Sequence, residues 1–238
     1  MPWVLAMDWV ETLFLHWRVD AASMRDRIPR AIEIDTFDGD AWASIVAFRI
    51  AGARPRGAPR PLAYPTFPEV NVRTYVRCGG RSGVWFFSLD AQSRFAVALG
   101  RHAAFLPYVD ADIAPAFDGA TLSYDLARAS RDMPAARFAA RARFGGDARP
   151  ATPGSLDDWL VQRLAFFTVA RHRVLRLDVA HAPWPLYATA IAQVEHDSLL
   201  SAAAIRTLDA EPLAHVSPGV AVRAWPLRSA EAVARMPT

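Results

Sequence analysis

The clearest pattern of apolar and polar positions in the chain lies in residues 67–76, where the two kinds of side chain alternate strictly. One face carries Val70, Val72, Thr74 and Val76, and the other carries Glu69, Asn71, Arg73 and Tyr75. Because successive side chains of a strand point to opposite faces, this pattern predicts a β-strand with one β-branched face and one polar face.

The segment that follows decides where the polar face is expected to point. Residues 78–83 predict a turn, and residues 84–89 predict a strand that is apolar on both faces. Such a strand is usually buried on both sides, so its hairpin partner is not expected to turn polar residues to bulk water. We therefore expect the polar face to line a wet cavity inside a β structure; the alternative is an ordinary solvated sheet face.

Similar patterns predict the other elements. Strands are expected at 14–19, 32–37, 41–48, 121–128, 137–144, 172–180, 186–194 and 220–225, and helices at 21–28, 92–105, 155–167 and 198–208. Asp20, Asp90 and Ser155 are the expected helix caps. Proline and glycine predict an exposed loop or lid at 51–65, a turn near Asp132 and a long connection at 145–154.

These elements predict an α+β fold that is mainly antiparallel β, with about ten strands and three or four helices. The chain has 238 residues, of which 53% are hydrophobic, so it can bury a sizeable core. We expect a single domain over residues 1–238, with 145–154 as an internal connection.

Composition excludes several classes of protein. No apolar run is long enough to cross a membrane, and the single cysteine, Cys78, fits a reducing cytoplasm. The formal charge of +3 comes from interleaved basic and acidic residues, which argues against nucleic acid as a partner. No cofactor motif is present, and the six histidines lack the spacing of metal ligands, so we predict no cofactor and no metal. A homo-oligomer stays open.

All 27 basic residues are arginine, since the chain contains no lysine. A genome rich in G and C explains the arginine content. The absence nevertheless matters for chemistry, because no internal side-chain amine can form a Schiff base with a carbonyl substrate.

Several strings of residues resemble the YqjF-like family of bacterial proteins of unknown function. The resemblance runs from about residue 10 to 226 and rests on His16-Trp17, residues 35–39, Trp42, residues 71–76, residues 83–89 and residues 181–184. That family resembles the acetoacetate decarboxylase superfamily. The resemblance implies a cone-like or barrel-like antiparallel β structure around a small-molecule cavity.

The resemblance also implies where a site would lie. In the decarboxylases a glutamate stands on an early strand, which Glu69 matches, and a Gly-Arg-Glu string precedes a proline and a catalytic lysine. Here Gly100-Arg101 and Pro107 match, but His102 replaces the glutamate and Tyr108 stands where the lysine is expected. The iminium route of decarboxylation is therefore rejected.

Two functions remain open for this site. In the first, the protein binds a small carboxylate, oxo-acid or polyketide-like carbonyl compound, and the ligand contacts come from Asn71, Arg73, Tyr75, Arg101 and His16. In the second, it is a lysine-independent enzyme of the lyase, cyclase or isomerase type. There Glu69 is the general acid or base, Tyr108 contacts a substrate oxygen, and arginine holds an anion. For Arg73, a structural ion pair with Glu69 is the competing interpretation.

Overall fold

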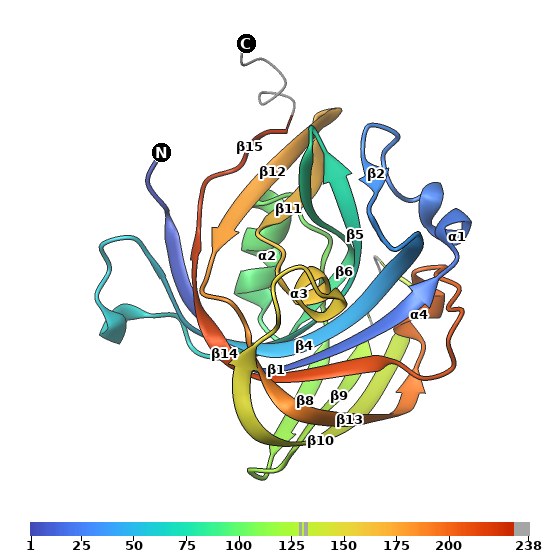
Figure 1. Ribbon diagram of the computed structural model, residues 1–238. Helices are drawn as coiled ribbons and strands as arrows, with labels where there is room; N and C mark the ends of the chain where they lie inside the picture. The colour runs from blue at the N-terminus through green and yellow to red at the C-terminus, as the bar shows by residue number, and fades with distance from the viewer. Residues whose placement is uncertain (129, 131–132, 231–238) are drawn as a thin grey trace.

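The computed structural model describes residues 1–128, 130 and 133–230, and most of them lie in two β-sheets. The large sheet contains β1 (Leu5–Val19), β2 (Glu33–Ile34), β3 (Thr36–Phe37), β4 (Asp40–Pro55), β5 (Phe67–Cys78), β6 (Arg81–Ala91), β7 (Tyr108–Asp110), β11 (Ala165–Ala170), β12 (Arg173–Ala180), β14 (Leu213–Ala224) and β15 (Arg228–Ser229). Their order is β2-β5-β4-β1-β14-β12-β11-β6-β7, with β3 on β4 and β15 on β12. Strand β5 also pairs with β6, so the large sheet curls back on itself (Figure 1).

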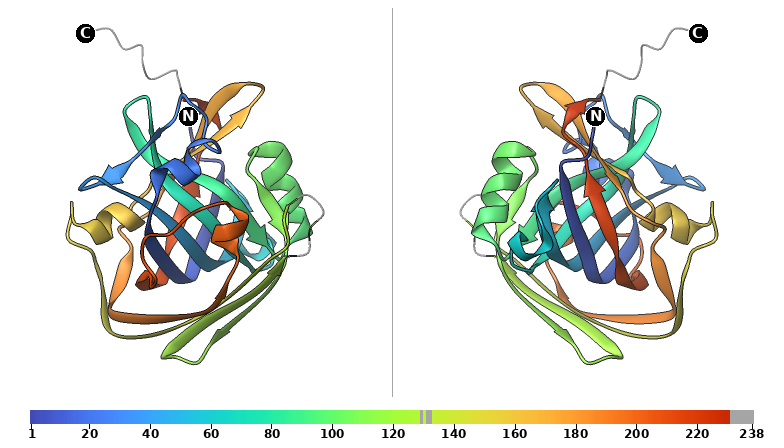
Figure 2. Two further views of the ribbon diagram at one scale, coloured as in Figure 1. Left: turned by 90° about the vertical axis from the view of Figure 1, so that its right-hand side faces the viewer. Right: turned by 90° about the vertical axis from the view of Figure 1, so that its left-hand side faces the viewer.

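The small sheet has four strands and lies beneath the large sheet (Figure 1, Figure 2). It contains β8 (Asp112–Phe117), β9 (Thr121–Arg128), β10 (Ala136–Pro150) and β13 (Pro185–Asp197), in the order β13-β10-β9-β8. The α-helices are α1 (Ala21–Arg25), α2 (Arg94–Ala103), α3 (Leu156–Val161) and α4 (Leu199–Ala202), and a 3-10 turn covers Arg60–Leu62. Pairing is antiparallel except where β6 meets β7 and β11.

A hydrophobic core fills the space between the two sheets. Leu13, Ile45 and Val72 of the large sheet belong to the same buried cluster as Tyr124 and Phe138 of the small sheet. The phenol of Tyr124 also donates a hydrogen bond to the backbone oxygen of Glu11, at 2.6 Å. The β-branched face of β5 thus packs on the small sheet, as the alternation requires.

A second core covers the opposite face of the large sheet. It is rich in aromatic side chains, among them Phe14, Phe48, Phe86 and Trp184, and α3 contributes Leu160. This is the face to which the polar side chains of β5 point, and all four of them are buried. The prediction that this face does not meet bulk water is confirmed, and so is the burial of β6 on both sides.

Two segments predicted as irregular are strand in part. Strand β4 continues to Pro55, so the exposed loop is shorter than 51–65, and β10 continues to Pro150 through most of the expected connection at 145–154. The prediction took glycine at 145–154 as a sign of irregular structure, but here glycine permits a bulge within a strand. Gly146 has a φ of +77° where the pairing of β10 with β13 shifts register.

The helices also differ from the prediction. Ser93 caps α2 by accepting a hydrogen bond from the backbone of Ala96, whereas Asp90 is buried within β6. Helix α3 ends at Val161, so Phe167 belongs to β11 instead. Helix α4 is a single turn, and the expected last strand begins earlier, at Leu213. The caps at Asp20 and Ser155 are confirmed.

The fold class is confirmed, since the molecule is mostly antiparallel β with four short α-helices in the described residues. Strands β7, β8, β11 and β15 were not predicted. Asp132 of the predicted turn lies outside the described residues. None of the described helices has the length and apolar composition needed to cross a membrane.

Candidate functional site

Polar side chains form rows across three neighbouring strands on the face of the large sheet that carries the aromatic-rich second core, which we call the inner face. His16 of β1 lies opposite Ser44 of β4, and Ser44 lies opposite Arg73 of β5. Asn71 lies two residues before Arg73 on the same face of β5, and Glu69 lies two residues before Asn71. Because cross-strand partners on one face approach closely, the strand pairing itself gathers these side chains.

Glu69 and Tyr108 meet at one end of this face. The Tyr108 hydroxyl donates a hydrogen bond to a carboxyl oxygen of Glu69 at 2.9 Å. Burial raises the pKa of Glu69 to about 7, although the hydrogen bonds from Tyr108 and Asn71 act in the opposite direction. Burial also raises the pKa of Tyr108, so its phenol stays protonated and able to donate. The two residues that the decarboxylase resemblance singled out are therefore direct neighbours.

Gly100 and Arg101 hold Tyr108 in this position. A Cβ atom on Gly100 would lie 2.2 Å from the Tyr108 ring, so α2 can approach that ring only with glycine there. The Nε of Arg101 donates a hydrogen bond to the backbone oxygen of Tyr108 at 2.6 Å. The Gly-Arg string thus positions Tyr108, a role that the sequence analysis did not predict for Arg101.

Arg73 is a buried cation, 7% exposed, at the centre of the face. Its Nη2 donates to the backbone oxygen of Leu160 at 3.2 Å, and its Nε has no hydrogen-bond partner. In the part of the chain that the structure describes, no carboxylate forms an ion pair with Arg73, so the structural pair with Glu69 is not present. Its guanidinium lies 5.8 Å from the ring centres of Phe14 and Tyr75.

His16, Ser44 and Tyr75 form a triangle beside Arg73 in which all three polar atoms lie within hydrogen-bond distance of one another. The Nδ1 of His16 lies 2.7 Å from the Ser44 hydroxyl and 3.1 Å from the Tyr75 hydroxyl, and the two hydroxyls lie 2.6 Å apart. All three residues are fully buried. The predicted ligand contacts His16, Arg73 and Tyr75 are therefore brought together.

Burial lowers the pKa values of three histidines in this part of the molecule, which disfavours their protonation. Burial lowers the pKa of His16 first, and the neighbouring His215 and Arg73 lower it further. Burial also lowers the pKa values of His181 and His215, and Arg73 adds to the effect on His181. Arg73 consequently lies beside imidazoles whose protonation is disfavoured.

Aromatic rings enclose the polar groups. Trp184 packs edge-on against Phe14 at a centroid distance of 5.0 Å and stacks on Trp9 at 6.0 Å. The ring of Phe86 meets that of Phe166 at 5.1 Å. Water is scarce in such surroundings, and electrostatic interactions there are stronger than at the surface.

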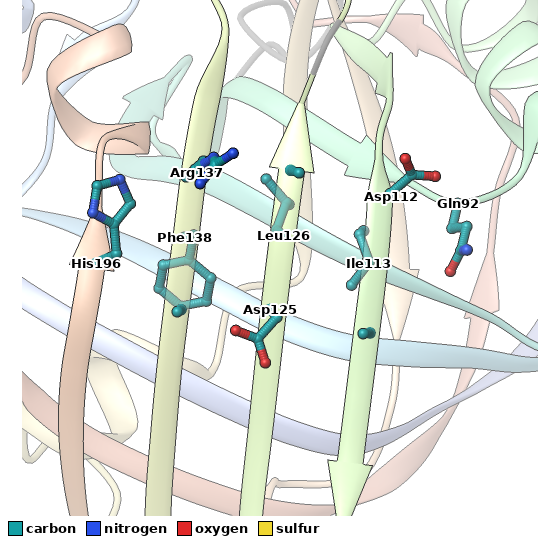
Figure 3. A pocket seen from close by; sticks show the side chains of 11 residues that line it. Gln92, Asp112, Ile113, Asp125, Leu126, Arg137, Phe138 and His196 are labelled. Carbon is teal, nitrogen blue, oxygen red and sulfur yellow. The ribbon is translucent and has the colours of Figure 1, made fainter.

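Two grooves lie elsewhere on the molecule. One, of about 570 Å³, runs over the small sheet, where Figure 3 shows His196, Arg137, Asp125 and Asp112 on neighbouring strands. The other, of about 660 Å³, lies beside Phe105 and Arg173. Neither includes Glu69 or Arg73. The expected wet cavity at the polar face therefore stays a prediction.

Sequence reasoning missed His215, Asp157 and Arg163, which complete the cluster. His215 binds Asp157 at 3.0 Å, and Arg163 forms an ion pair with Asp35 at 2.9 Å while its guanidinium lies over Trp159. His215 lies in residues 212–219, which contain two prolines and a glycine and precede the last expected strand at 220–225. Strand β14 pairs there with β1, which local sequence does not reveal.

Comparison with known sequences identifies relatives over nearly the whole chain. Residues 6–221 match the model of the DUF2071 family, described as an uncharacterised conserved protein. The uncharacterised protein YqjF of Bacillus subtilis (strain 168) is 35% identical over 226 residues, which are 95% of this chain and 92% of that protein. The resemblance predicted from the residue strings is confirmed.

Solved structures share the fold at low sequence identity. An acetoacetate decarboxylase-like enzyme from Sphingomonas wittichii RW1 gives a TM-score of 0.67 at 17% identity, covering 96% of this chain and 93% of that one. The enduracididine biosynthesis enzyme MppR in complex with pyruvate gives a TM-score of 0.66 at 13% sequence identity, and the match covers 97% of this chain and 91% of that one. Acetoacetate decarboxylase from Legionella pneumophila gives a TM-score of 0.64 at 12% sequence identity, and the match covers 96% of this chain and 89% of that one.

Proposed function

Because this chain belongs to the DUF2071 family of uncharacterised conserved proteins, whose description states no activity, we propose a function from the site itself. The protein binds a small carboxylate or carbonyl-containing anion, and Arg73 holds the anionic group. The observation that carries this proposal is a buried guanidinium without a carboxylate partner among the described residues. A buried charge without a counter-ion is costly, and guanidinium pairs well with carboxylate.

The groups around Arg73 suit an anion that also carries oxygen functions. The side-chain oxygen of Asn71 and the Nε2 of His16 have no hydrogen-bond partner among the described residues. MppR, which shares the fold, is described in complex with pyruvate, so short oxo-acids are reasonable first probes. Arg101 completes the ligand contacts that we propose. Cytoplasmic location remains our expectation from the single cysteine.

The test compares ligand-induced stabilisation in the wild type and in Arg73→Met. Pyruvate, acetoacetate and butyrate are added at increasing concentration, and the melting temperature is followed. A ligand at 100 times its Kd stabilises a protein by about 2.7 kcal/mol, which is several degrees for a chain of this size. We expect the shift in the wild type and its loss in Arg73→Met.

Arg143→Met is the matched control, because Arg143 is exposed on the small sheet and its loss leaves the proposed site intact. Native mass spectrometry of freshly purified protein adds a second readout, a ligand retained by the wild type and by this control. Equal ligand shifts in Arg73→Met and the wild type, or no shift of the wild type with any acid, would overturn the proposal.

A second candidate function is supported by the pKa of Glu69, which burial raises to about 7. A carboxyl group with such a pKa is suited to proton transfer at neutral pH. We propose it as the alternative: a lysine-independent enzyme in which Glu69 removes a proton from a carbon acid and Tyr108 contacts the substrate oxygen. Arg73 then has the same role as in the binding protein.

Deuterium exchange separates the two functions. In D₂O, an enzyme of this kind exchanges the methyl protons of bound pyruvate, which proton NMR detects without knowledge of the final product. We expect exchange to stop in Glu69→Gln while the pyruvate affinity stays within a few-fold. Exchange at the wild-type rate in that variant would exclude Glu69 as the base. No exchange by the wild type would favour the binding protein.

A further inference from the structure

His16 of β1 and His215 of β14 lie side by side on the face of the large sheet that carries the aromatic-rich second core. Their ring centroids are 5.3 Å apart, and the rings are inclined by 62°. His16 is fully buried and His215 is 8% exposed. Neither of the two proposed functions gives His215 a role.

In each ring, one nitrogen forms hydrogen bonds and the other has no hydrogen-bond partner among the described residues. His16 uses Nδ1 for Ser44 and Tyr75, which leaves Nε2. His215 uses Nε2 for the carboxylate of Asp157, which leaves Nδ1. A buried polar atom without a partner is uncommon in proteins, and two such atoms on neighbouring rings point to a shared occupant.

The hydrogen-bond partners assign the tautomer of each ring. The ionised carboxylate of Asp157 only accepts, so Nε2 of His215 carries the proton and Nδ1 is an acceptor. In the triangle, one of the two hydroxyls of Ser44 and Tyr75 donates to Nδ1 of His16, and the other hydroxyl donates to the first. A proton on Nδ1 of His16 would leave one of the two buried hydroxyl hydrogens without an acceptor in the triangle. His16 therefore carries its proton on Nε2, which is a donor.

We propose that Nε2 of His16 and Nδ1 of His215 together bind one hydroxyl group of the ligand whose anionic group Arg73 holds. A hydroxyl accepts one hydrogen bond and donates another, so it satisfies a donor and an acceptor at once. A carbonyl oxygen satisfies only His16. The ligand class is therefore a short hydroxy acid, or an oxo-acid in its enol form.

The spacing of the strands agrees with a short ligand. His16 and Arg73 stand opposite the same residue, Ser44, on the two strands that flank β4. Their Cα atoms are thus about 10 Å apart, twice the distance between neighbouring strands, and both side chains reach over the same face. This inference rests on the proposed role of Arg73, and its test separates the two.

The test is calorimetric titration with butyrate and with 2-, 3- and 4-hydroxybutyrate, four acids that share a carboxylate and differ in a hydroxyl. The wild type should prefer at least one hydroxy acid over butyrate by about 10-fold, as two ordinary hydrogen bonds provide. His16→Leu and His215→Leu should reduce that preference to about 1-fold while butyrate affinity is retained. His102→Leu is the control, because His102 is exposed on α2.

A second measurement does not depend on the variants folding. In the wild type labelled with ¹⁵N-histidine, the preferred hydroxy acid should shift the ring nitrogens of His16 and His215, and butyrate should leave them unchanged. Equal affinity for all four acids, with binding lost in Arg73→Met, would overturn the hydroxyl site and leave the Arg73 proposal standing. No binding of any acid would overturn both.

Discussion

Glu69 makes the free energy of unfolding depend on pH. Its pKa is about 7 in the folded protein and about 4.5 without the effects of burial. Because this carboxyl group is easier to protonate in the folded state, its deprotonation favours the unfolded chain. The protein therefore loses stability as pH rises through this interval. At about 1.4 kcal/mol per pKa unit, the loss is about 3 kcal/mol between pH 4.5 and 7.

We predict that Glu69→Gln removes this pH dependence. The unfolding free energy of the wild type relative to the variant should fall by about 3 kcal/mol between pH 4.5 and 7 and then level off. Urea denaturation at a series of pH values measures the difference. Glu195→Gln, at a half-exposed position on β13, should leave the wild-type pH dependence unchanged. The same difference between wild type and Glu69→Gln at pH 5 and pH 8 would contradict the prediction.

Single positions on β5 were predictable because a strand alternates its faces regardless of its neighbours. Glu69, Asn71, Arg73 and Tyr75 were placed on one face by that rule alone, and they are all buried there. The partner of Arg73 was not predictable, since an ion pair with Glu69 and an arginine free to hold a ligand both fit the same alternation. The choice depends on Leu160, whose backbone oxygen reaches Arg73 from 87 residues away.

Helix α2 shows that apolar residues at helical spacing do not always face the core. Its apolar residues Phe95 and Leu99 predict a buried stripe, but these side chains are 59% and 50% exposed, and Val97 is the buried one. The ring of Phe95 stacks on Tyr64 at 5.2 Å instead of entering the core. Helical periodicity finds a face but not the surface against which it packs.

We predict that Val97→Ala destabilises the protein more than Leu99→Ala, although valine is the smaller residue. Loss of the buried side chain of Val97 should cost about 2 kcal/mol, because transfer and cavity terms add. At Leu99, the variant should lose less than about 1 kcal/mol, since half of the side chain already contacts water. Thermal and urea denaturation of both variants check the order. The reverse order would mean that the Leu99 face is covered in solution.

The two sheets are joined by a buried ion pair as well as by their hydrophobic core. Arg128 of the small sheet donates to Asp90 of the large sheet at 2.6 Å and to the hydroxyl of Ser88 at 2.9 Å. Both charged residues are almost fully buried. Sequence analysis assigned Asp90 to a helix cap, because a capping aspartate and a buried ion-pair aspartate look alike until the partner strand is known.

We predict that Arg128→Leu lowers the unfolding free energy by about 3–5 kcal/mol, because the carboxylate of Asp90 is left buried without its partner. Replacing both residues by leucine should recover most of that loss, since neither charge then remains buried. Chemical denaturation of the single and double variants measures the coupling. Arg149→Leu, which breaks an exposed pair with Asp147, should change stability little. A double variant as unstable as Arg128→Leu would contradict the prediction.

The pairing of β1 with β14 has a consequence for synthesis on the ribosome. Strand β1 lies between β4 and β14, so its second neighbour is made about 200 residues after it. At about 5–20 residues per second, roughly 10–40 s pass during which β1 has an unpaired edge. During that interval the nascent chain can add a strand from another chain at this edge, and His16 has no His215 beside it. The proposed ligand site is thus among the last parts of the molecule to be completed.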